Sequence, residues 1–126
     1  MSRTIISASN APAALGPYSH AVSANGLVFT AGQVGIVPGS GALAEGGIEA
    51  QTRQVLENIS AVLQAAGTDF DRVVKTTIFL ASMDDFATVN GIYAQYFSQD
   101  PPARSTVAVA GLPVGALVEI ETVALV

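Results

Sequence analysis

The C-terminal segment 117–126 has the alternation of a strand that is largely apolar on both faces. Side chains along a strand point to opposite faces in turn. One face carries Val118, Ile120, Thr122, Ala124 and Val126, and the other carries Leu117, Glu119, Glu121, Val123 and Leu125. Such a strand needs cover on both sides, which restricts the folds open to the chain.

Two segments have the periodicity of amphipathic helices. In 48–66 the apolar residues recur every three or four positions, and Glu49, Arg53 and Glu57 line the opposite face as i,i+4 charge pairs. The second helix is predicted over 82–97, with Ser82 as its N-terminal cap and Asp85 completing a capping box. Two helices cover only one face of a wide sheet, so a partner subunit is the simplest cover for the other.

Six strands are predicted: 4–6, 20–24, 27–31, 73–80, 103–109 and 117–126. Asn25-Gly26 joins the second strand to the third in a tight hairpin, and 32–47 forms a glycine-rich loop. The order β-β-β-α-β-α-β-β indicates an α+β fold, with two helices on one face of a six-stranded mixed sheet. The length of 126 residues fits one domain over 1–126.

The chain has little charge for a soluble monomer. Charged residues make up 12% of the sequence, about half of the usual ~25%. Mean hydropathy is +0.48. We therefore expect part of the surface to be buried against other subunits.

The charge balance and the cysteine count narrow the class of protein. The net charge is −5 and the basic residues form no cluster, so nucleic acid is not an expected partner. No apolar run reaches ~18 residues, so no membrane span is expected. The first ten residues lack the pattern of a signal peptide. The chain has no cysteine, which is compatible with a reducing cytoplasm, the expected location.

His20 is the only histidine, and without cysteine beside it a metal site of the usual zinc type is not predicted. Its neighbour Ser19 points to the opposite face of the strand, which excludes a Ser–His pair between these two residues. A structural or surface role for His20 is therefore favoured.

Three residues are candidates for chemistry: Tyr18, Arg104 and Glu119. Arg104 follows Pro101-Pro102 at a stiff junction between loop and strand, where its guanidinium suits a carboxylate or phosphate. Glu119 lies in the next predicted strand. The turn between the two strands allows the strand of Glu119 to pair antiparallel with the strand of Arg104. A glutamate with restricted solvent access can take a proton from water. A structural Arg–Glu pair explains the same two residues equally well.

Five motifs, in order along the chain, carry a resemblance to a known family. They are Gly16-Pro17-Tyr18-Ser19-His20-Ala21, Thr30-Ala31-Gly32-Gln33, Asp85-Phe86-Ala87-Thr88-Val89-Asn90, Pro102-Ala103-Arg104-Ser105 and Val118-Glu119-Ile120-Glu121. Together they closely resemble the reactive intermediate deaminase family (RidA, YjgF-type) over nearly the whole chain.

The resemblance implies a homotrimer with a chorismate-mutase-like fold, in which the sheets face inward and three clefts lie between subunits. It implies hydrolysis of reactive 2-imino acids, such as 2-iminobutanoate and 2-iminopropanoate, to 2-oxo acids and ammonia. This activity protects other enzymes from these intermediates and needs no cofactor. Small imino or oxo acids are the implied ligands.

By this resemblance, Arg104 would bind the substrate carboxylate and Glu119 would activate the attacking water. Tyr18 would line the cleft, and main-chain groups near Gly32 and Thr106 would complete an anion site. Asn90 lies within a family motif. Ala31 and Thr106 stand where many members have serine and cysteine, so a direct role of those side chains would change rate or substrate preference.

Two other functions are compatible with the residues. A non-catalytic trimer that binds 2-oxo acids and regulates a partner needs Arg104 but not Glu119. Ribonuclease activity has been attached to some relatives, but the acidic charge and the single histidine argue against it here.

The bare sheet face predicts that the chain self-associates. Light scattering at micromolar concentration should give about three times the monomer mass of 12.8 kDa. A monomer at that concentration would contradict both the buried face and a site between subunits.

Overall fold

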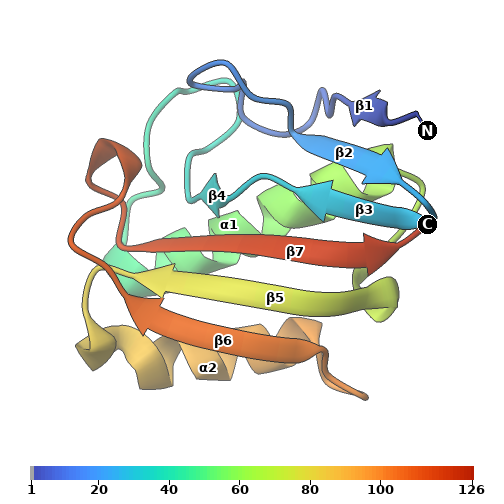
Figure 1. The fold of residues 1–126 in the computed structure, drawn as a ribbon. Coiled ribbons are helices and arrows are strands. Elements are labelled where there is room, and N and C mark those ends of the chain that lie inside the picture. Colours follow the sequence, from blue (N-terminus) through green and yellow to red (C-terminus); the bar gives the residue numbers. More distant parts are fainter. Residues whose placement is uncertain (1) are drawn as a thin grey trace.

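A computed structural model describes residues 2–126 as one mixed sheet with two helices packed against it (Figure 1). The strands are β1 (Thr4–Ile6), β2 (Ala21–Ala24), β3 (Leu27–Thr30), β4 (Gln33–Val34), β5 (Val73–Leu80), β6 (Ala103–Ala108) and β7 (Val118–Leu125). The helices are α1 (Gly47–Ala65) and α2 (Phe86–Tyr96). The sheet order is β1-β2-β3-β7-β5-β6, with β4 pairing beside β3 on β7. The predicted α+β class and element order are confirmed.

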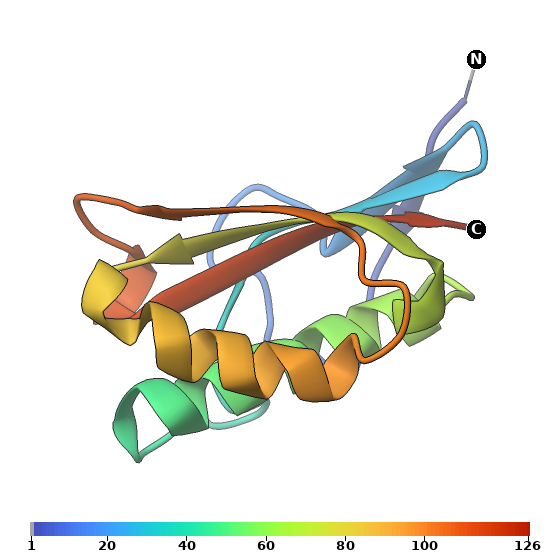
Figure 2. The ribbon, with the colours of Figure 1, turned by 90° about the horizontal axis from the view of Figure 1, so that it is seen from below.

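Both helices lie on the same side of the sheet (Figure 2). The core between the layers is apolar, with Val55, Leu56, Ile59 and Leu63 from α1, Val89, Ile92 and Tyr93 from α2, and Ile78, Leu80, Val118 and Ile120 from the strands. In β7, the residues that face the helices are buried, and those between them are half-buried or exposed. The predicted division of this strand into two faces is therefore confirmed.

The face of the sheet away from the helices is open and carries large apolar side chains. Ile5, Phe29, Val107 and Leu125 are between 44% and 52% exposed. Strand register places them on the face opposite the core. Within this chain, nothing in the part that the structure describes covers them.

The sheet differs from the prediction by one strand. Gln33 and Val34 pair with Ile120 and Glu119 of β7, so the sheet has seven strands and not six. This short strand begins the segment that was predicted as a glycine-rich loop. A run of two residues has no detectable period, which is why the sequence did not reveal it.

The predicted option of antiparallel pairing between the strands of Arg104 and Glu119 is wrong. β5 lies between β6 and β7, and it pairs parallel with β6 and antiparallel with β7. The turn after β6 therefore crosses the end of β5, and no hairpin forms.

Local turn signals in the sequence are confirmed. Asn25 and Gly26 have φ values of 53° and 78° between β2 and β3, which is the left-handed geometry that a two-residue hairpin needs. Gly67 ends α1 with φ 81°. The capping box at Ser82 is wrong in detail, because the Ser82 hydroxyl accepts from the Asp84 N–H and a 3-10 turn precedes α2.

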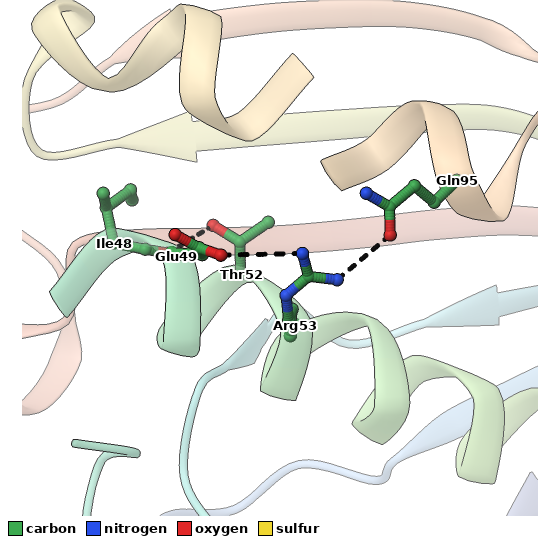
Figure 3. Close-up of polar contacts among 5 residues, drawn as sticks. All are labelled: Ile48, Glu49, Thr52, Arg53 and Gln95. Carbon is green, nitrogen blue, oxygen red and sulfur yellow. Dashed lines mark hydrogen bonds and ion pairs between the residues drawn. The ribbon is translucent and has the colours of Figure 1, made fainter. Parts of the chain in front are cut away.

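Polar contacts join the outer faces of the two helices (Figure 3). Arg53 lies 3.6 Å from the Glu49 carboxylate and donates to Gln95 Oε1 of α2 at 3.0 Å. The predicted Arg53–Glu57 pair is absent from the described residues, and Glu57 instead accepts a 3.0 Å hydrogen bond from the Tyr96 hydroxyl. These exposed contacts align the helices but add little stability.

A buried amide on α1 holds β4 in place. Asn58, which is 1% exposed, donates to the carbonyl oxygens of Val34 at 3.1 Å and Ile36 at 2.9 Å. Its own side-chain oxygen accepts from Gln54 at 2.9 Å. Gly35 lies between the two carbonyls, where a Cβ would come within 2.8 Å of the Gln51 carbonyl oxygen. The segment that follows Gly32 is thereby pressed onto α1.

Among residues 2–126, no helix is both long and apolar enough to cross a membrane.

We predict that Asn58→Ala lowers the free energy of unfolding by about 1–3 kcal/mol for each of the two carbonyls left without a donor. Urea unfolding followed by circular dichroism measures the change. Gln64→Ala, on the same helix, is the matched control, because its amide donates to the Ser60 hydroxyl at 3.3 Å in an exposed pair and its loss should cost under about 1 kcal/mol. Equal losses in the two variants would contradict the assignment of Asn58 as the anchor of β4.

Candidate functional site

Arg104 lies on the edge strand β6, where it is level with Thr76 of β5. Its side chain reaches the helix side of the sheet, with its guanidinium carbon 5.0 Å from the ring centre of Tyr93 and 5.7 Å from that of Phe86. The stiff Pro101-Pro102 segment leads into the strand, as predicted. Beside the guanidinium lies an open cavity of about 420 Å³, lined by Asn90, Tyr93, Ala94, Phe97, Pro101, Pro102 and Arg104. Asn90 and Arg104 are therefore brought to the same cavity.

Thr106 lies two residues further along β6, so it shares the face of Arg104. Its hydroxyl oxygen is buried and has no hydrogen-bond partner among the described residues. A buried hydroxyl without a partner costs stability. The Thr106 side chain, and not only its backbone, is therefore an available donor near Arg104.

Glu119 lies on the open face of β7, since its neighbours Val118 and Ile120 are buried in the core. Its carboxylate lies against Gly32, where a Cβ would overlap Glu119 Oε2. Burial and, to a smaller extent, the negative charge of Glu121 raise the pKa of the Glu119 carboxyl above its usual range. Gly32 and Glu119 are therefore in direct contact, a neighbour relation that the sequence did not predict.

Tyr18 projects from the Gly16-Pro17 turn and is 46% exposed. The Leu15 N–H donates to its hydroxyl at 3.1 Å, which orients the ring. Tyr18 and Gly32 border the same small cavity, of about 20 Å³. Ala31, next to Gly32, donates from its backbone N–H to the His20 carbonyl at 2.9 Å. Tyr18, Ala31, Gly32 and Glu119 thus form a second group of site residues.

His20 has the structural role that the sequence favoured. It is 9% exposed, and its Nδ1 accepts from the Ala8 N–H at 2.9 Å. Its Nε2 then donates to the Pro12 carbonyl at 2.8 Å. The imidazole ties the segment before Tyr18 to the start of β2.

The two groups of predicted site residues lie on opposite faces of one sheet. Arg104 packs on α2, whereas Glu119 points to the open face, and the whole of β5 lies between their strands. Arg104 makes no ion pair within the described part of the chain, so a structural Arg104–Glu119 pair inside one subunit is wrong. One chain alone does not bring the candidate residues together.

Phe86 and Tyr93 are two neighbours of the site that the sequence did not identify as such. Both lie within the helix predicted over 82–97, where apolar residues are most often core. Their spacing of seven residues places both on the face that reaches β6, but only the strand order shows that Arg104 lies there.

Comparisons with known proteins identify the family and the fold of this chain. The sequence model of the family described as Endoribonuclease L-PSP matches residues 8–126. Reactive Intermediate Deaminase A, chloroplastic, from Arabidopsis thaliana is 52% identical over 97% of this chain and 65% of that protein. The 2-iminobutanoate/2-iminopropanoate deaminase of Mus musculus is 51% identical over 97% of this chain and 90% of that protein.

A solved structure of the Rid-family protein YyfA from Yersinia pestis has the same fold. It is 53% identical, with a TM-score of 0.94 over 99% of this chain and 100% of that chain. The chain therefore belongs to the Endoribonuclease L-PSP family, which also contains proteins named reactive intermediate deaminases. The resemblance drawn from the five motifs is confirmed.

We predict that Glu121→Gln lowers the pKa of Glu119, because it removes the neighbouring negative charge, but leaves it above the usual range, because burial remains. Carboxyl carbon NMR during a pH titration measures the shift. A raised carboxyl pKa contributes stability that is present below the ordinary glutamate range and is lost as pH rises through the raised value. The wild type should therefore lose more stability than the variant over this rise in pH.

Glu49→Gln on α1 serves as the control, since its charge lies on the helix side of the molecule, and it should leave the Glu119 titration unchanged. An unchanged Glu119 pKa in Glu121→Gln would contradict the electrostatic part of the shift.

Proposed function

We propose that the protein is an enzyme that hydrolyses reactive 2-imino acids, such as 2-iminobutanoate and 2-iminopropanoate, to 2-oxo acids and ammonia. The observation that carries the proposal is an arginine on β6 that makes no ion pair with any residue of 2–126, combined with a half-buried glutamate of raised pKa on the open face. The names of relatives from plant and mouse, at about half identity over nearly the whole chain, support the same reaction.

The active site is assembled from two subunits. Arg104 and Glu119 lie on opposite faces, so a small substrate reaches both only if the Arg104 edge of one chain meets the open face of another. The exposed apolar side chains on that face and the edge position of β6 suit such a contact. A cyclic trimer, with each open face turned inward, repeats this contact three times.

The chemistry needs positioning and proton transfer. Arg104 binds the substrate carboxylate through its planar fork of donors, and Asn90 lines the same cavity. Glu119 takes a proton from water as the water oxygen adds to the imine carbon, and it then returns that proton to the former imine nitrogen. Collapse of the carbinolamine then releases ammonia and leaves the 2-oxo acid. The raised pKa brings Glu119 nearer to the working pH for both proton transfers.

Tyr18 and the main chain at Ala31 and Gly32 complete the glutamate end of the cleft. Glycine at position 32 lets the backbone touch the Glu119 carboxylate, and any side chain there would displace it. The Gly32 N–H is the main-chain donor assigned to developing negative charge, because the Ala31 N–H already donates to the His20 carbonyl. Tyr18 closes the cleft from its turn and presents its ring toward the substrate.

Two alternatives are less well supported. A non-catalytic binder of 2-oxo acids is less well supported, because relatives of about half identity over nearly the whole chain are named as deaminases. Ribonuclease activity appears in the description of the family, but the net charge of −5 does not suit a phosphate backbone. A cytoplasmic location stays a prediction, since one relative is named as chloroplastic.

The test is release of the 2-oxo acid from an imine made in situ. We predict that Arg104→Ala and Glu119→Gln each lower kcat/KM by about 10²–10⁴-fold, the range expected for a lost proton-transfer or positioning group. Semicarbazide competition and a coupled ammonia assay measure the rate. Glu119→Gln should still bind 2-oxobutanoate, because Arg104 is intact.

Arg53→Ala and Glu49→Gln are the matched controls, since they remove the same charges from the outer face of α1. Both should retain wild-type turnover. If Arg104→Ala hydrolyses the imine as fast as the wild type, the proposed function is wrong. If Glu119→Gln keeps full turnover, the proton chemistry belongs to another residue.

A further inference from the structure

We propose that Tyr93 is a positioning residue that fixes the guanidinium of Arg104 for carboxylate binding, through its ring on one side and its hydroxyl on the other. The inference deepens the proposed function, because it rests on Arg104 being the residue that grips the substrate. The contacts between Tyr93 and Arg104, however, do not depend on which reaction follows substrate binding.

Two contacts hold Tyr93, one at its hydroxyl and one at its ring. Its hydroxyl lies 2.7 Å from Thr76 Oγ1 in the core, and both residues are at most 5% exposed. Its ring stacks on Phe97, with centres 4.5 Å apart and planes 29° apart. The ring therefore has one orientation, and it presents a face to Arg104 at 5.0 Å.

The Thr76 anchor belongs to the same part of the sheet as the arginine. Thr76 of β5 is paired in register with Arg104 of β6. These contacts form a closed loop. The β6 backbone at Arg104 pairs with Thr76 of β5, the Thr76 hydroxyl contacts the Tyr93 hydroxyl, and the Tyr93 ring faces the Arg104 guanidinium. A closed path of this kind fixes the arginine relative to its own strand, and not only to the helix.

Arg104 needs such support because no charged group of the described residues holds its guanidinium. Within residues 2–126 it makes no ion pair, and its long side chain would otherwise sample many rotamers. A cation held over an aromatic face uses that face for attraction. The in-plane N–H groups of the guanidinium stay available for a carboxylate. Phe86, at 5.7 Å, adds a second ring to the same cradle.

A purely structural role for Tyr93 is the competing explanation, since the side chain is buried in the core of the molecule. The two explanations differ in what happens to Arg104 itself. A structural residue affects stability, whereas a positioning residue also changes the environment of the guanidinium and its affinity for anions.

The experiment follows the Nε–H NMR signal of Arg104, assigned by its loss in Arg104→Lys, together with the Kd of 2-oxobutanoate. In the wild type, we expect ring currents to move this signal away from those of the other three arginines. Tyr93→Leu should move it back toward them and weaken 2-oxobutanoate binding by about tenfold. Tyr93→Phe keeps the ring and should preserve the signal, with binding within about threefold of the wild type.

Ile92→Ala is the matched control, because Ile92 is the adjacent residue of α2, is equally buried and supplies neither of the two rings that face Arg104. It should lower the melting temperature and leave both the Arg104 signal and Kd unchanged. If Tyr93→Leu does not fold, Thr76→Val tests the anchor alone and should weaken 2-oxobutanoate binding by about threefold.

The proposal is overturned if the Arg104 signal is the same in the wild type and in Tyr93→Leu, or if Ile92→Ala shifts it as much. Unchanged binding in Thr76→Val would remove the anchoring role of the hydroxyl. The NMR result does not depend on imine hydrolysis. Failure of the proposed function would appear instead as equal imine turnover in the wild type and Arg104→Ala.

Discussion

The sheet of this protein has two apolar faces and helices for only one of them. Burial of apolar surface is the main driving force of folding. The helices α1 and α2 bury the inner face, where Leu56, Ile59 and Ile92 pack against β5 and β7. The same force acts on Phe29 and Val107, which the chain itself leaves exposed. The low charge of the sequence and the position of the candidate site both follow from this imbalance, if a second copy supplies the missing cover.

Division of the candidate site across the sheet has a chemical benefit. Arg104 and Glu119 in one subunit are separated by the sheet, so they do not neutralise each other as a buried pair. The arginine keeps its donors free over the rings of α2, and the glutamate keeps a raised pKa against Gly32. In the proposed trimer, these opposite charges would meet across an interface wide enough for a substrate between them.

Much of the fold could be predicted from the sequence because its signals are local. The 3–4 spacing in α1, the Asn25-Gly26 hairpin and Gly67 at the helix end all act within a few residues. The errors have non-local causes. β4 exists because Asn58 holds the carbonyls of Val34 and Ile36, and the separation of β6 from β7 arises because β5 enters between them.

The sequence by itself determined which residue types are available for chemistry, the family to which they belong, and the alternation that puts Glu119 opposite the core. Only the tertiary structure decided that Arg104 and Glu119 lie on opposite faces, that Tyr93 lies beneath the guanidinium, and that the Thr106 hydroxyl is buried without a partner. The physical reason is that alternation along one strand is a local property, whereas strand order and helix placement depend on how distant segments share a single core.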